Sequence, residues 1–131
     1  MEKKENSQKR IDFEARFAQA RRSPILTDEE VRKIVFRIQK GDADAEKELM
    51  QLCTFFVFSI VRIRLNKGEI MEQQIEKAIE AGTEGLILAA KKFGPSYHNF
   101  KFIPLAIWYI RHSIDEALNE QAYEDNNPQR S

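Results

Sequence analysis

Apolar residues recur at helical spacing along most of this chain, and this periodicity constrains the fold more than any other feature. Most of its five glycines and four prolines stand between the periodic segments, where they end one helix and precede the next. Strand-rich folds need more turn residues than this. A length of 131 residues, 42% of them hydrophobic, suits one domain with a real core. The sequence therefore predicts a single all-α domain of about four to five helices.

Local signals place the helix boundaries. Thr27 and Glu30 form a capping box, because the side chain of each can satisfy the backbone amide of the other. Pro24 ends the preceding helix, and Pro104 suits the first turn of the last one. The expected helices cover residues 11–22, 28–40, 43–65, 70–93 and 104–121. Residues 1–10 are predicted as a disordered charged lead-in, 11–123 as the helical domain and 124–131 as an acidic polar tail.

The apolar residues of these helices predict which faces are buried. The first helix carries Ile11, Phe13, Phe17 and Ala20 among charged residues. The helix over 43–65 is apolar on more than half of its circumference, so we expect it to be covered on two sides. Its main face is Ala45, Leu49, Leu52, Phe56, Ile60 and Ile63, and its second stripe is Phe55, Phe58 and Arg62. The helix over 70–93 is expected to bury Ile75, Ile79, Gly82, Leu86 and Ala89 and to expose Glu72, Glu76, Glu80 and Glu84.

Bulk charge and cysteine content limit the classes of function. Twenty-one basic and twenty-one acidic side chains leave no net charge, so only the distribution of charge can argue for nucleic-acid binding. The single Cys53 excludes an internal disulfide and a cysteine metal cluster, and the charged N-terminus carries no secretory signal. We therefore expect a cytoplasmic protein. The longest apolar run, 52–61, is too short to span a membrane, so no membrane partner is expected.

No arrangement of residues suggests an enzyme. His98 and His112 are fourteen residues apart without cysteines or carboxylates at metal-ligand spacing, so neither a metal site nor a cofactor is expected. Cys53 lies in the most apolar stretch, where a buried, inert thiol is the usual outcome. The chain has no glycine-rich phosphate loop and no serine nucleophile motif. We expect no catalysis.

A basic and aromatic stretch runs from Gly85 to Ile114 without one carboxylate. Cations bind phosphates, and flat rings stack on unpaired bases, so this combination suits single-stranded or melted nucleic acid. Aromatic residues at helical spacing are also common in the core of a small domain, and the pattern alone leaves both interpretations open. On the last helix Ala106, Ile110, Ile114 and Ala117 form the expected core arc, whereas Leu105, Trp108, Tyr109 and His112 form an arc available to a partner.

Four stretches, in the same order, resemble the second conserved region of housekeeping-class bacterial RNA polymerase sigma factors and the segment just before it. They are SPILTDEE (23–30), RIQKGDA (37–43), EGLILAAKKF (84–93), and FKF with WYIR (100–102 and 108–111). The resemblance covers residues 22–121. It implies a compact orthogonal helical bundle that docks on the clamp coiled coil of the polymerase core and that recognises and opens the minus-ten promoter element.

The same resemblance implies two sets of site residues. Trp108 and Tyr109 would wedge against the last paired base, and His112 stands where the family has a glutamine that reads the upstream base pair. The DNA-binding set is Arg62, Phe100, Lys101, Phe102, Trp108, Tyr109, Arg111 and His112. The polymerase-binding set is Glu76, Lys77, Glu80, Thr83 and Glu84.

The chain departs from the family pattern at positions where DNA should lie. Leu105 replaces an aromatic ring that stacks on the flipped base, and Asp115 and Glu116 add negative charge one turn after His112. Cys53 and Phe55 replace an asparagine and an arginine, Ile103-Pro104 replaces a polar stretch, and in the docking run 77–82 only Ile79 and Gly82 match. Each departure weakens the expected contact.

Two hypotheses follow. In the first, the chain is a stand-alone sigma-factor-like domain that binds RNA polymerase core and contacts minus-ten promoter DNA within the holoenzyme. Because the chain ends ten residues after Gln121, we expect a second chain to supply the domain that reads the upstream promoter element. In the second, the chain keeps the sigma fold as a protein-interaction module, acting as a regulator, competitor or dimer, and no longer binds DNA.

Overall fold

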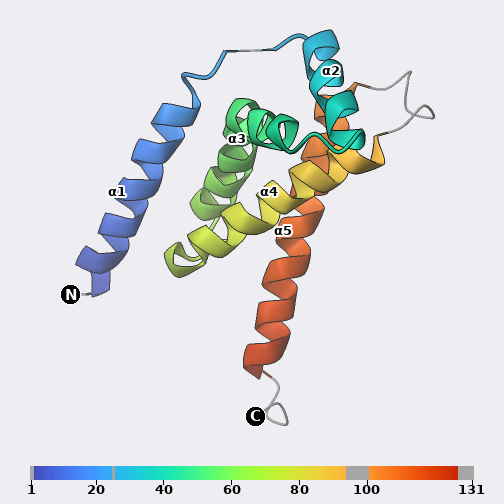
Figure 1. The fold of residues 1–131 in the computed structure, drawn as a ribbon. Helices are drawn as coiled ribbons and strands as arrows, with labels where there is room; N and C mark the ends of the chain where they lie inside the picture. The colour runs from blue at the N-terminus through green and yellow to red at the C-terminus, as the bar shows by residue number, and fades with distance from the viewer. Residues whose placement is uncertain (1, 25, 94–100, 127–131) are drawn as a thin grey trace.

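The regular elements of the computed structural model are all helices within residues 2–24, 26–93 and 101–126, the part of the chain that the structure describes (Figure 1). They are α1 (Glu2–Ala20), α2 (Asp28–Gln39), α3 (Ala43–Asn66), the short 3₁₀ helix η1 (Glu72–Gln74), α4 (Ile75–Lys92) and α5 (Phe102–Asn126). The prediction of an all-α bundle is confirmed.

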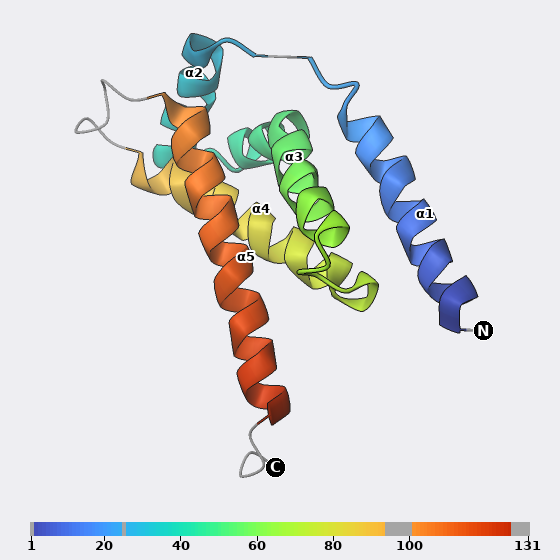
Figure 2. The same ribbon diagram turned by 180° about the vertical axis from the view of Figure 1, so that it is seen from behind.

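The helices pack around a pair of crossing elements, α4 and α5, which form the most extensive contact in the molecule (Figures 1 and 2). α3 packs on α4, and α2 contacts α3, α4 and the start of α5. α1 lies on the outer side of α3, away from α5, and the chain then crosses over to α2 through residues 21–27. α1 therefore covers the bundle from one side, while α5 presents its outer face on the other.

Local capping fixes the starts of α2 and α3. The Glu30 amide donates to Thr27 Oγ1 at 3.1 Å, and the Thr27 amide donates to Glu30 Oε1 at 3.2 Å, so the predicted capping box is present. Asp42 caps α3 by accepting from the amides of Asp44 and Ala45 at 3.0 and 3.3 Å. Gly41 adopts a φ of 90°, which suits glycine, where the chain turns between the two helices.

Several boundaries differ from the sequence-based expectation. Residues 2–10, which the charge pattern predicts as a disordered lead-in, belong to α1. α4 begins at Ile75 instead of residue 70, because the Gln74 side chain accepts from the Met71 amide at 2.9 Å and holds the short η1 turn before it. α5 begins at Phe102, whose amide donates to Asp28 Oδ1 of α2 at 3.3 Å. Because Asp28 is distant from Phe102 in sequence, no local sequence pattern predicts that it caps the start of α5.

The core confirms some predicted faces and corrects others. α2 buries Val31, Ile34, Val35 and Ile38, and α4 buries every residue expected there. On α3 the buried row is Ala45, Leu49, Cys53, Val57, Val61 and Leu65, spaced by four. The predicted main face of α3 was therefore wrong in part: Ile63 is 52% exposed, and Leu52, Phe56 and Ile60 are half-buried. Ile11 of α1 is also exposed rather than buried.

Candidate nucleic-acid and polymerase interfaces

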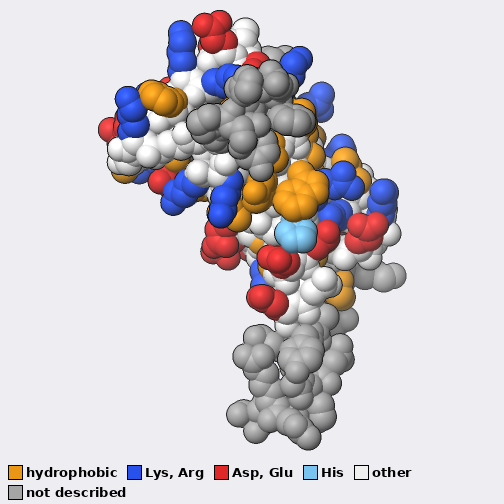
Figure 3. Space-filling model, turned by 90° about the vertical axis from the view of Figure 1, so that its right-hand side faces the viewer, with side chains coloured by type: hydrophobic (Ala, Val, Ile, Leu, Met, Phe, Trp, Pro, Cys, Tyr) orange, Lys and Arg blue, Asp and Glu red, His pale blue; other side chains and the backbone are white. Residues whose placement is uncertain are grey.

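The outer face of α5 presents an aromatic cluster. Trp108 is 57% exposed and stacks in parallel on His112, with ring centroids 4.9 Å apart and an interplanar angle of 9°. Tyr109, half-buried, meets the Trp108 ring edge to face at 5.1 Å. Figure 3 shows this side of the molecule, with the pale blue imidazole between an apolar patch and several acidic side chains. Lys101 and Arg111 are also exposed. We call Trp108, Arg111 and His112 the α5 face.

Two aromatic residues of the predicted DNA-binding set do not join the α5 face. Phe102 is fully buried and packs edge to face on Phe93, with centroids 5.5 Å apart. Its ring fills the core where α4 ends and α5 begins, so the expectation that it contacts DNA is corrected. Phe100 lies outside the described residues. The available arc of α5 is therefore centred on Trp108, and Lys101 lies just before the start of the helix.

Both carboxylates that follow the α5 face have basic partners within the chain. Asp115 pairs with the guanidinium of Arg64 on α3. Glu116 Oε1 lies 3.3 Å from His112 Nε2. The side chain of Arg64 is only 14% exposed, so it reaches Asp115 from the protein side of α5. Arg64 therefore offsets part of the negative charge that the sequence places beside the α5 face.

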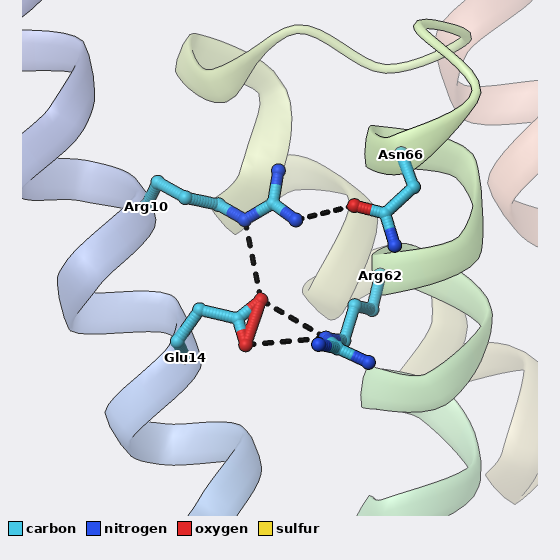
Figure 4. Close-up of polar contacts among 4 residues, drawn as sticks. All are labelled: Arg10, Glu14, Arg62 and Asn66. Carbon is cyan, nitrogen blue, oxygen red and sulfur yellow. Dashed lines mark hydrogen bonds and ion pairs between the residues drawn. The ribbon is translucent and has the colours of Figure 1, made fainter.

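The guanidinium of Arg62, a predicted phosphate contact, is hydrogen-bonded to a side chain of α1. Its Nε donates to both carboxylate oxygens of Glu14, at 3.0 and 3.1 Å (Figure 4). Arg10 Nε donates to the same carboxylate at 3.2 Å, and Arg10 also contacts Asn66. Burial disfavours the ionised Glu14, but the hydrogen bonds and charges of Arg62 and Arg10 outweigh it and lower the pKa of this carboxyl.

The second apolar stripe of α3 is covered by the same helix. Phe58 packs against Phe13 with ring centroids 5.5 Å apart, and Phe55 stacks on Phe17 at 5.8 Å. Phe13 and Phe17 are both buried. The expectation that α3 is covered on two sides is confirmed, and α1 of the same chain supplies the second cover.

The predicted polymerase-binding residues lie along one side of α4. Glu80 and Glu84 are exposed, and Glu76, also exposed, pairs with Arg16 of α1. Lys77 and Thr83 are half-buried, and Thr83 Oγ1 donates to the Ile79 carbonyl at 2.8 Å. We call Glu76, Glu80 and Glu84 the acidic face of α4. Leu88, one turn beyond Glu84, is 41% exposed and extends this side with an apolar residue.

Known proteins resemble the chain over most of its length, although no protein-family model matches it. It is 34% identical over 99 residues to the RNA polymerase sigma factor RpoS of Coxiella burnetii, which covers 76% of this chain and 27% of that protein. It is 33% identical over 103 residues to the sigma factor SigA of a Bacillus species, covering 77% and 26%. It is 34% identical over 99 residues to SigA of Clostridium acetobutylicum, covering 76% and 25%. The chain is a divergent relative of the sigma factors.

The sigma-like chain spans about a quarter of the length of the curated relatives it matches. The resemblance inferred from its four ordered stretches is confirmed by these similarities. Within the described residues of the sigma-like chain, no helix is long and apolar enough to cross a membrane, and no group of three or more histidines, cysteines or carboxylates could hold a metal ion.

The structure of the sigma-like chain separates the predicted site residues into three groups. Trp108, Arg111 and His112 lie together on α5 and are exposed. The acidic face of α4 forms a separate row. Arg62 is half-buried and pairs with Glu14 of α1. Sequence reasoning missed Glu14 and Arg16, two α1 residues that form ion pairs with predicted site residues, because their pairings bridge 48 and 60 positions of sequence.

Proposed function

We propose that the chain is a sigma-type module of transcription initiation, which binds the RNA polymerase core through α4 and contacts minus-ten promoter DNA through α5. The observation that carries this proposal is the exposed, braced Trp108, held between His112 and Tyr109 on a helix that packs tightly on α4. A flat ring fixed in this way can stack on an unpaired base with little loss of side-chain freedom. Lys101, just before the start of this helix, and Arg111 on it are both exposed and supply cations for the phosphates of the DNA backbone.

The acidic face of α4 supports the polymerase part of the proposal. Its three glutamates form one exposed row, with the exposed Leu88 at its end. An acidic row with an apolar end suits a basic protein surface that has an apolar pocket beside it. The proposed partner is the clamp coiled coil of the polymerase. A second chain would supply the domain that reads the upstream promoter element. The chain would act in the cytoplasm. No catalytic step is assigned to it.

Substitution of Trp108 tests the DNA contact. Trp108→Ala should abolish open-complex formation by polymerase core loaded with this chain, while the affinity for core stays unchanged. Phe36→Ala is the matched control, because Phe36 is also 57% exposed but lies on α2. Core loaded with Phe36→Ala should open promoters like the wild type. If open complexes still form with Trp108→Ala, the proposed contact between α5 and promoter DNA is wrong.

The alternative function is a protein-interaction module that keeps the sigma fold and does not bind DNA. The observation that favours it is Leu105, which lies half-buried against the core and offers no ring beside Trp108. Binding of a single-stranded minus-ten oligonucleotide, with and without core polymerase, separates the two functions. Affinity that falls steeply as salt rises supports the DNA-contacting module. Binding to polymerase without any affinity for the oligonucleotide supports the alternative.

A further inference from the structure

An apolar cavity of about 320 Å³ lies where the start of α5 meets α2, α3 and the segment between α1 and α2. None of its described lining residues belongs to the α5 face or to the acidic face of α4. Its walls include Leu26, Val31, Leu52, Cys53, Phe56 and Ile103. Folded domains contain few voids larger than a water molecule, so a cavity of this size is a candidate binding site.

The lining of the cavity sets the polarity of a ligand that would fill it. Among the described lining residues, Arg21, Ser23 and Cys53 alone carry a polar side chain. The Ser23 hydroxyl donates to the Gln51 carbonyl at 3.4 Å, and a thiol is only a weak hydrogen-bond donor. Cavities with so few polar partners exclude water, and one of about 150 Å³ binds benzene. A cavity of about twice that volume accepts a larger hydrocarbon group.

Arg21 places a positive charge at the edge of this cavity. Its side chain is exposed, and its guanidinium lies over the Phe17 ring, 5.8 Å from the centroid. Phe17 stacks on Phe55, which is another lining residue, so this contact holds Arg21 beside the aromatic wall. Within the described part of the chain, no carboxylate forms an ion pair with Arg21. Its guanidinium can therefore donate to a carboxylate of a bound molecule.

We propose that this cavity binds a small amphiphilic acid, with the hydrocarbon part between α3 and α5 and the carboxylate on Arg21. The cavity lies outside both candidate interfaces, so the inference goes beyond the proposed function and does not depend on it. A nucleobase would fit the cavity less well, because its ring carries several donors and acceptors. Apart from Arg21 and Ser23, the described lining offers only the Cys53 thiol to pair with them.

A series of straight-chain acids tests the apolar part of the site. Butanoate, hexanoate and octanoate are titrated into the full chain, which is isotope-labelled at its leucine and isoleucine methyl groups and followed by NMR. Affinity should rise about fourfold for each CH₂ group that enters the cavity. The methyl signals of Leu52 and Ile103 should shift, whereas those of Leu88, exposed on α4, should stay unchanged. Affinity that is independent of chain length, or equal shifts at Leu88 and Leu52, would overturn the proposal.

Matched variants of two adjacent arginines test the carboxylate contact. Arg21 and Arg22 are both exposed, but Arg22 does not line this cavity. Arg21→Gln should weaken hexanoate binding at least about threefold, whereas Arg22→Gln should bind hexanoate like the wild type. Hexan-1-ol lacks the charge and should bind all three proteins equally, which shows that the cavity is intact in the variants. An equal loss of hexanoate affinity in both variants, or a loss of hexan-1-ol affinity in Arg21→Gln, would contradict the contact.

Thymidine monophosphate distinguishes an apolar acid from a nucleotide, because it combines an anionic group with a polar ring. At concentrations where octanoate saturates the site, we expect it to leave the methyl signals of Leu52 and Ile103 unchanged. If it shifts both signals in a saturable manner, and if Arg21→Gln abolishes these shifts, the cavity is a nucleotide site and the proposal is wrong.

Discussion

Gly85 of α4 lies directly against the main-chain carbonyl of Tyr109 on α5. A Cβ at position 85 would lie 2.6 Å from the Tyr109 carbonyl oxygen and 3.0 Å from Ile110 Cα. Both are backbone atoms, which cannot move aside without shifting the whole helix. The largest helix contact in the molecule, and with it the position of Trp108, therefore depends on the absence of a side chain at Gly85.

Gly85→Ala should lower the free energy of unfolding by about 2 kcal/mol, even though alanine favours a helix over glycine by about 1 kcal/mol. Urea denaturation followed by circular dichroism measures the change. Gly82→Ala is the control on the same helix. Its Cβ would meet side-chain atoms, Val57 Cγ1 at 2.8 Å and Ile110 Cγ2 at 3.3 Å, which can shift more easily than backbone. A Gly82→Ala loss as large as that of Gly85→Ala would contradict this account.

The buried faces could be predicted best for helices that have one apolar stripe and charged residues on the other side. α2 has such a stripe and a local capping box, and its four buried residues were all expected. α3 has apolar residues on most of its circumference, so spacing alone cannot choose between neighbouring faces. The choice is made by packing: the row from Ala45 to Leu65 enters the core, and Phe58 faces α1. Ile63 belongs to neither contact and stays exposed.

The candidate site was predictable in its residues but not in their pairings. The exposure of Trp108, Arg111 and His112 follows from their helical spacing relative to the buried Ile110 and Ile114. The Arg62–Glu14 and Arg64–Asp115 pairs join residues 48 and 51 positions apart. Such pairs form only after the helices have packed, so they cannot be predicted from a local sequence pattern. The burial of Phe102 depends in the same way on Phe93 from the preceding helix.

Cys53 should be unreactive in the folded protein. It is 1% exposed, borders an apolar cavity of about 320 Å³, and burial raises the pKa of its thiol to about 11. At pH 8 this pKa leaves about a hundredfold less thiolate than an ordinary cysteine has. Labelling with a small aromatic disulfide at pH 8 should be slow in buffer and fast in unfolding concentrations of urea. Rapid labelling under native conditions would show that the cavity opens to admit the reagent.

Pairing with Arg64 should limit how much the Asp115 carboxylate lowers the affinity for DNA. Because Arg64 already offsets its charge, Asp115→Asn should raise oligonucleotide affinity by less than about twofold. Arg64→Gln exposes the carboxylate and should lower affinity by about threefold. In the Arg64→Gln background, Asp115→Asn should recover most of that loss. Titrations of the two single variants and the double variant measure the coupling, and purely additive effects would mean that the pair does not screen Asp115.

The attachment of α1 should weaken in acid through Glu14. Burial opposes ionisation of this carboxyl, but hydrogen bonds and charges from Arg62 and Arg10 lower its pKa below the ordinary value of 4.5. A lowered carboxyl pKa contributes stability that is fully present above pH 4.5 and is lost as the pH falls through the folded-state pKa. Glu14→Gln should remove this part of the acid dependence.

Hydrogen exchange in α1, corrected for the intrinsic effect of pH on exchange, measures this contribution between pH 3 and 7. The pKa values of Glu30 and Asp42 are also lowered, by hydrogen bonds from Thr27 in the first case and mainly from Arg37 in the second. Both carboxylates remain in Glu14→Gln, so the difference between the two proteins isolates Glu14. Wild-type α1 should lose protection below pH 4.5 relative to the variant. Parallel curves for the two proteins would mean that the ionisation of Glu14 does not contribute to the attachment of α1, and that other contacts, such as the Phe13 and Phe17 rings and the Arg16–Glu76 pair, hold the helix.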